Sequence, residues 1–116
     1  MKIATATKPP IHLQKGTMEA FAVEGKEKSA SVRGVTVRPD VGNLPIDATL
    51  CQTNPSTGQC LSAPSPSLKV NINHNEAIVF SVFLTATGSI AKGTVRVDFT
   101  EKGALIGSGK VAVTTK

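Results

Sequence analysis

The stretch Ala77-Ile-Val-Phe-Ser-Val-Phe-Leu-Thr85 indicates the fold class of this 116-residue chain. Its apolar residues fall on both parities of a two-residue repeat, and most are β-branched or aromatic, which is typical of a strand. A strand that is apolar on both sides needs cover from water on both sides. We therefore predict a strand in the middle of a sheet, covered on much of both faces.

Shorter stretches on either side alternate apolar and polar residues, the pattern of half-buried strands that have one face on a core and one in water. The clear cases are Leu68-Lys-Val-Asn-Ile-Asn73, Val95-Arg-Val-Asp-Phe-Thr100 and Ile46-Asp-Ala-Thr-Leu50. Weaker candidates are residues 3–7, 17–23, 31–38 and 109–115. No window of helical length repeats its apolar residues at i, i+3, i+4 and i+7.

Turn-forming residues separate these stretches at intervals of roughly 8–12 residues, which is typical of a sandwich or a barrel. We expect turns at Lys8-Pro9-Pro10, Glu24-Gly25-Lys26, Pro39-Asp40-Val41-Gly42, Asn54-Pro55-Ser56-Thr57-Gly58, Ala63-Pro64-Ser65-Pro66, Asn73-His74-Asn75 and Glu101-Lys102-Gly103. The last of these is short enough for a β-hairpin. The prediction is an all-β fold, an immunoglobulin-like antiparallel β-sandwich of seven to nine strands, in a single domain over residues 1–116.

The composition narrows the classes of partner. Hydrophobic residues make up 40% and charged residues 18% of the chain, so it should fold rather than stay disordered. There is no Trp or Tyr, and the four rings, Phe21, Phe80, Phe83 and Phe99, all lie in apolar runs, which predicts a core role. Without flat rings for stacking, nucleic-acid binding is not expected, and the hypothesis of a glycan-binding protein is weakened. The net charge of +5 comes from scattered residues, so it favours solubility over a nucleic-acid stripe.

Residues 1–30 contain no apolar core of a signal peptide, and no stretch approaches the ~20 apolar residues that cross a bilayer. We therefore expect no membrane span. The chain is then either a mature or excised segment or a protein that never used a signal.

Cys51 and Cys60 enclose the segment Gln52–Gln59, whose Asn-Pro and Thr-Gly pairs reverse the chain direction. Two Cys at the stem of such a loop can approach closely enough for a disulfide. Closing a ten-residue loop stabilises the fold by about 2.7 kcal/mol in the chain-entropy model. We predict this disulfide and an oxidising compartment. The alternative is a pair of reduced thiols; a zinc site lacks further ligands.

Three segments resemble an immunoglobulin-like β-sandwich module of bacterial secreted and surface proteins. They are Leu50-Cys-Gln-Thr-Asn-Pro-Ser-Thr-Gly-Gln-Cys-Leu61, Ala63-Pro-Ser-Pro-Ser67 and Val79-Phe-Ser-Val-Phe-Leu-Thr-Ala-Thr-Gly88. The resemblance covers roughly residues 44–115, and the Cys-to-Cys loop is its most specific part. It implies an extracellular or cell-surface location, with the periplasm as an alternative.

No motif of catalysis is found in the sequence. Gly107-Ser-Gly-Lys110 lacks the spacing of a phosphate-binding loop and better fits a strand with a bulge or a close approach. His12 and His74 fall in separate turn regions, and the eight carboxylates are dispersed. We therefore predict a protein that is not an enzyme, with no catalytic residue, metal or cofactor.

The leading hypothesis is a non-enzymatic structural or adhesive module that contacts a protein partner or neighbouring copies. Its candidate contact residues lie in the loop between the two Cys, because loops on rigid scaffolds commonly carry recognition: Gln52, Thr53, Asn54, Ser56, Thr57 and Gln59. One alternative is a subunit of an extracellular filament or virion, in which Lys2–Thr7 pairs with a neighbour's sheet instead of forming the first strand of its own domain. Another is a carbohydrate-binding module.

Overall fold

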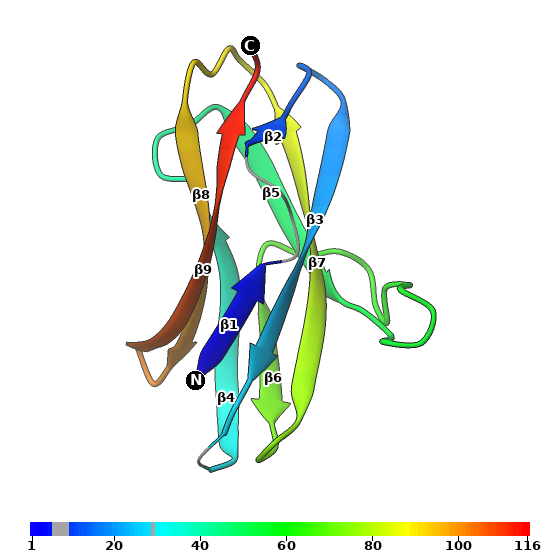
Figure 1. Cartoon of the computed structure of the whole chain (residues 1–116), viewed down its shortest axis with the longest axis vertical. Coiled ribbons are helices and arrows are strands. Elements are labelled where there is room, and N and C mark those ends of the chain that lie inside the picture. The colour runs from blue at the N-terminus through cyan, green and yellow to red at the C-terminus, as the bar shows by residue number, and fades with distance from the viewer. Residues whose placement is uncertain (6–9, 29) are drawn as a thin grey trace.

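Two β-sheets pack face to face in the computed structural model of the chain, which describes residues 1–5, 10–28 and 30–116 (Figure 1). The described residues form nine strands: β1 (Lys2–Thr5), β2 (Ile11–His12), β3 (Met18–Lys26), β4 (Val32–Asp40), β5 (Ile46–Gln52), β6 (Leu68–Ile72), β7 (Ala77–Ala86), β8 (Gly93–Glu101) and β9 (Ala104–Thr114). The all-β sandwich expected from the alternating stretches is thus confirmed. No described helix is long and apolar enough to cross a membrane.

Sheet A has the strand order β1-β3-β7-β5, and sheet B has the order β2-β9-β8-β4-β6. Neighbouring strands are antiparallel, apart from the short parallel pair β2–β9. The chain crosses from one sheet to the other at each step from β3 to β8, so consecutive strands in this part of the chain lie in different sheets. Strand β7 lies between β3 and β5, in the middle of sheet A as its sequence predicts.

The core lies between the inner faces of the two sheets. Strand β8 follows its predicted alternation, with Val95, Val97 and Phe99 buried and their neighbours turned outward. From sheet A, Phe80 meets Phe99 with ring centroids 5.7 Å apart in an edge-to-face arrangement. This aromatic pair joins the two sheets at the centre of the core.

One predicted turn is wrong, and another begins two residues later than predicted. Glu24-Gly25-Lys26 lies inside β3, where Gly25 packs against the inner face: a Cβ at Gly25 would lie 3.0 Å from Phe99 Cε2. The glycine here provides room for a neighbouring ring and does not turn the chain. Strand β4 likewise continues through Pro39 to Asp40, and the chain turns only after it, at Gly42 with φ 59°.

Phe83 is not a core residue, although its apolar surroundings predict one. It is half-buried and points away from the core, opposite Ala20 of β3, while Phe21, Phe80 and Phe99 are buried. Strand β2 was not expected from the sequence. The expected turn at Lys8-Pro9-Pro10 and the end of the candidate strand 3–7 fall on residues 6–9, outside the described residues.

The predicted hairpin at Glu101-Lys102-Gly103 joins β8 to β9. Lys102 (φ 50°) and Gly103 (φ 81°) both have positive φ, as two-residue hairpin turns of type I′ require. The close approach predicted for Gly107–Lys110 is also present. A Cβ at Gly109 would lie 2.9 Å from both Ile3 Cγ2 and Thr5 Cγ2, so the missing side chain lets β1 pack against β9 of the other sheet.

Candidate functional site

The predicted disulfide joins Cys51, near the end of β5, to Cys60, with Cα atoms 5.5 Å apart. Cys51 is buried, whereas Cys60 is exposed. The bond therefore ties an exposed loop to a fixed point of sheet A. A disulfide of this kind indicates an oxidising compartment outside the cytosol.

The loop that the disulfide closes, residues 52–60 including Cys60, is ordered by its own hydrogen bonds. Asn54 Oδ1 accepts a bond from the Ser56 amide (2.8 Å), and the Asn54 carbonyl accepts one from the Gly58 amide (2.7 Å). The Asn54 amide donates in turn to the Gln59 carbonyl (2.9 Å). Gly58 has φ 74°, a conformation that suits glycine. These bonds give the loop a defined shape in addition to its covalent closure.

The chain that leaves the loop returns along the free edge of β5. The Leu61 amide donates to the Gln52 carbonyl (2.8 Å), and Leu50 and Ser65 exchange two backbone bonds of 2.8 and 2.9 Å. This return arm pairs part of the edge strand of sheet A, which would otherwise present open backbone groups. In Figure 1 the loop and its return arm project from the side of the sandwich.

The predicted contact residues divide into two groups. Ser56, Thr57 and Gln59 are exposed at the tip, together with Pro55. Thr53 is buried, and both its amide and its Oγ1 donate to the Val79 carbonyl, at 2.9 and 3.0 Å, so it anchors the loop to β7 and is not available to a partner. Gln52 and Asn54 are half-buried, and the Asn54 side chain holds the loop.

A hollow of about 240 Å³ lies where the loop meets the sandwich. Its walls come from the base of the loop, from β6 and from the start of β7, and the residues that line it are Gln52, Thr53, Pro55, Asn71, Glu76, Ala77, Ile78 and Val79. The hollow thus adjoins the exposed tip at Pro55, and Gln52, Asn71 and Glu76 contribute polar side chains to its lining.

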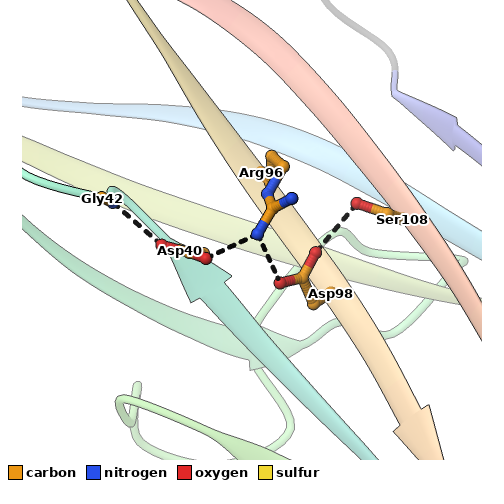
Figure 2. Close-up of polar contacts among 5 residues, drawn as sticks. All are labelled: Asp40, Gly42, Arg96, Asp98 and Ser108. Carbon is orange, nitrogen blue, oxygen red and sulfur yellow. Dashed lines mark hydrogen bonds and ion pairs between the residues drawn. The ribbon is translucent and has the colours of Figure 1, made fainter. Parts of the chain in front are cut away.

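A second polar cluster lies on the outer face of sheet B (Figure 2). Arg96 of β8 donates from Nη2 to Asp40 Oδ2 of β4 (2.7 Å) and to Asp98 Oδ2 (3.4 Å). Asp98 Oδ1 accepts from Ser108 Oγ of β9 (2.9 Å), and Asp40 Oδ1 accepts from the Gly42 amide (2.9 Å). The cluster therefore links three neighbouring strands through side chains.

The electrostatics of this cluster favour ion pairing over acid catalysis. The hydrogen bond from Arg96, and then the one from the Gly42 amide, lowers the pKa of the Asp40 carboxyl. The same contact with Asp40 raises the pKa of the Arg96 guanidinium. A general acid at neutral pH needs a carboxyl whose pKa is raised. Asp40 is shifted in the opposite direction and stays ionised.

Beside the cluster runs a groove of about 230 Å³, lined by Thr36, Arg38, Asp40, Asp98 and Thr100. All five lining residues have polar or charged side chains, and none of them is aromatic. Sugars are usually held partly by stacking on a ring, so this groove gives the carbohydrate-binding hypothesis only hydrogen-bonding groups.

These carboxylates look dispersed along the sequence, so the cluster was not predicted. Asp40 and Asp98 are 58 positions apart along the chain, but β4 and β8 pair antiparallel with Arg38 opposite Asp98 and Asp40 opposite Arg96. The signal was present in both stretches, because Arg38-Pro-Asp40 and Arg96-Val-Asp98 carry opposite charges two residues apart. Antiparallel pairing of two such stretches sets each cation beside an anion.

The two His lie in different parts of the structure. The ring of His12 hydrogen-bonds to the Lys116 carbonyl, and the ring of His74 to the Lys28 carbonyl at 2.8 Å. His12 thus holds the C-terminal residue beside β2, and His74 holds the turn after β6 beside the segment that follows β3. Among the described residues, no group of three His, Cys, Asp or Glu is placed to hold a metal ion.

No family model and no curated protein matches this chain. Among the solved structures that are similar to it is one described as "The details of glycolipid glycan hydrolysis by the structural analysis of a family 123 glycoside hydrolase from Clostridium perfringens". The two share 16% sequence identity at a TM-score of 0.51 over 88% of this chain. This chain spans 21% of that chain's length. At this identity the likeness shows the fold alone.

Proposed function

We propose that this chain is a non-enzymatic, immunoglobulin-like module that presents the loop 52–60 to a protein partner. The strand order of sheet A supports the immunoglobulin-like assignment, because β1-β3-β7-β5 follows the A-B-E-D order of that fold. The sheet B order β9-β8-β4 parallels G-F-C. The departure is β6, which joins the β4 edge after the chain has already formed β5.

The observation that carries the proposal is the disulfide-closed, internally bonded loop on the side of a sandwich. Cys51 fixes one end of the loop to β5, Thr53 anchors it to β7, and the return arm holds its other end. The exposed tip residues are then held in one arrangement before any partner arrives. Such preorganisation lowers the ordering cost of binding.

The disulfide also supports a location outside the cytosol, and we propose that the module belongs to a secreted or surface protein. The sandwich would then serve as a rigid spacer between neighbouring domains as well as a carrier of the loop. Ser56, Thr57 and Gln59 are the contact residues that this proposal retains.

The alternative use of the N-terminal strand for assembly has less support. Strand β1 pairs in register with Val23–Lys26 of β3 in its own sheet. Its Ile3 packs into the space that Gly107 and Gly109 leave on β9. The segment Lys2–Thr5 therefore already has a place in its own sandwich, which favours the leading proposal.

The test compares two variants that add the same charge at two exposed places. Ser56→Arg/Gln59→Arg changes the loop tip, and Ser89→Arg/Gln14→Arg changes exposed Ser and Gln residues outside it. Each protein is immobilised and exposed to surface proteins extracted from the source organism. We expect a captured protein that the unchanged chain and the control pair retain and that the loop pair loses. Equal capture by both variants, or none by the unchanged chain, would overturn the proposal.

A further inference from the structure

Strand β5 stops short of the start of β7 in sheet A. The ladder between the two strands ends with Gln52 opposite Phe80, whereas β7 begins at Ala77. Within the described part of the chain, one backbone bond lies beyond this ladder, from the Thr53 amide to the Val79 carbonyl (2.9 Å). Among the described strands, the start of β7 therefore has a neighbour on the β3 side only.

The backbone of Ala77 points into the gap that β5 leaves. In an antiparallel pair, every second residue of a strand turns its N–H and C=O toward the same neighbour. Val79 faces the β5 side, because its carbonyl accepts the bond from Thr53, and Ala77 lies two residues before it on the same strand. Ala77 is also exposed. It therefore offers one backbone donor and one backbone acceptor at the free edge of β7.

Pro55 explains why β5 does not continue along β7. The register of Gln52 opposite Phe80, if continued, would place residue 55 opposite Ala77, and proline has no amide N–H to donate to the Ala77 carbonyl. The chain instead leaves the sheet at Asn54 and Pro55 and forms the loop. The pairing position beside Ala77 is thus open to the backbone of a different segment.

The gap coincides with the hollow of about 240 Å³ at the base of the loop, because residues 77–79 form part of the lining of that hollow. Gln52, at the end of β5, and Asn71, on β6, add side-chain amides to the same lining. The Oδ1 of Asn71 accepts a bond from the Gly34 amide (2.9 Å), so its NH₂ group is the one that can donate to a ligand. These groups complement the amides and carbonyls of a peptide.

Glu76 gives the hollow a preference for positive charge. It is exposed, and it is the only charged residue among those that line the hollow. Its Oε1 accepts a long bond of 3.4 Å from the Asn73 amide, which leaves the carboxylate able to pair with a cation. The lining residues include no aromatic ring for a flat ligand and no cation for an anionic one. A peptide with a basic residue therefore fits this lining best.

We propose that this hollow binds an extended, basic peptide segment of a protein partner, which pairs with Ala77 at the edge of sheet A and sets a Lys or Arg side chain beside Glu76. Strand addition of this kind draws affinity from main-chain hydrogen bonds and specificity from side chains. The inference rests on the proposed function, because it names the segment that a partner of the loop 52–60 inserts.

The hollow and the loop tip can serve the same partner, because Pro55 belongs to both. In Figure 1 the loop projects beside the part of β7 that runs on past the end of β5. The free edge at residues 77–79 is short, about 10 Å. Binding at the hollow alone is accordingly weak, and it gains strength when the same partner also contacts the tip.

Nuclear magnetic resonance of the purified, isotope-labelled chain tests this site with short synthetic peptides. The peptides are capped at both ends and alternate Thr and Val around a central residue, which is Lys in one peptide and Glu in another. A further Lys peptide has all its backbone amides N-methylated, so it cannot donate backbone bonds. With the Lys peptide at up to about 5 mM, the amide signals of Ala77 and Val79 should shift. The Glu peptide and the N-methylated peptide should each bind more weakly.

The matched variants each remove one exposed carboxylate: Glu76→Gln at the hollow, and Glu19→Gln near the opposite end of β3. Glu76→Gln should raise the dissociation constant of the Lys peptide about twofold to fivefold and remove its advantage over the Glu peptide. Glu19→Gln should bind like the unchanged chain. The proposal is overturned if the Lys peptide leaves the Ala77 and Val79 signals in place, if the N-methylated peptide binds equally well, or if both variants bind alike.

The peptide experiment is independent of the capture experiment on the loop tip. Ser56 and Gln59 do not line the hollow, so Ser56→Arg/Gln59→Arg should bind the Lys peptide as the unchanged chain does. Loss of capture by this pair with no peptide binding to any protein would refute the hollow alone. Peptide binding without capture would refute the tip alone.

Discussion

Sheet B turns seven charged side chains outward, whereas the middle rows of sheet A turn none. Both sheets bury their inward positions in the same core. On sheet B the outward Arg96 of β8 pairs across strands with Asp40 of β4. On sheet A the outward row around Phe83 has Ala20 on one side and Thr49 on the other. The two-residue period of the strands therefore buries a core in both sheets. The outward side chains are charged on sheet B but uncharged in the middle of sheet A.

The largest expected effect comes from removing rings on the two sides of β7. Phe80→Ala empties a fully buried position beside Phe99, so we expect the free energy of unfolding to fall by about 3–5 kcal/mol. Phe83→Ala removes a half-buried ring from the outer face and should cost about 1 kcal/mol or less at low protein concentration. Urea unfolding of both variants measures the difference.

The same pair of variants tests which side of β7 belongs to the core. If Phe83→Ala instead destabilised the chain as much as Phe80→Ala, then the outer face of sheet A would act as a core within a single chain. The distinction between the two faces of this strand would then be lost.

The next effect is smaller and concerns the border of the sheet A face. Cys51→Ala/Cys60→Ala opens the loop, and the chain-entropy estimate for a ten-residue loop predicts a loss of about 2.7 kcal/mol in the free energy of unfolding. The backbone bonds of the return arm then hold the loop alone. Hydrogen exchange should speed up at the amides of Leu61 and Ser65, which bond to β5.

Sheet B supplies the internal control for this variant. The amides of β8 and β9 take part in the sheet B ladder and should open only with global unfolding. A local increase in exchange at β8 that matched the increase at Leu61 would contradict the assignment of the disulfide to the loop. Such a result would mean that the disulfide stabilises the whole sandwich and not only the loop at the edge of sheet A.

Much of the fold could be predicted from the sequence, because alternation reports burial directly. Residues 95–100 alternate strictly, and their strand and its buried side were both predicted correctly. The loop disulfide was predicted because Asn-Pro and Thr-Gly turns bring its two Cys together. These features depend on neighbours along the chain.

The errors concern features that depend on segments far apart in the sequence. Gly25 was predicted to be a turn residue. A glycine is needed there because the ring of Phe99, which belongs to the other sheet, leaves little room for a side chain. Phe83 looked like a core residue because its strand is apolar on both parities, and only the arrangement of layers shows which side is inside. The Asp40–Arg96–Asp98 cluster needed the register between β4 and β8, which a single stretch does not contain.

The smallest expected effect is on the charged face, where Asp40→Asn weakens the ion pair with Arg96. The pKa of Asp40 is lowered in the folded chain, chiefly by the hydrogen bond from Arg96, so the carboxylate stabilises the fold above its ordinary value of 3.8. That contribution is lost as the pH falls from there through the lowered pKa. The two proteins should therefore differ slightly in free energy of unfolding at neutral pH and converge in acid.

Both groups of this ion pair are partly exposed to solvent, so the difference should be small and should shrink with added salt. Urea unfolding of the unchanged chain and Asp40→Asn, from neutral pH down to about pH 2, measures it. Asp47→Asn, at an exposed outward position of sheet A, is the matched control for the loss of one carboxylate. A difference between Asp40→Asn and the unchanged chain that grew in acid would reverse the sign and refute the ion pair as its source.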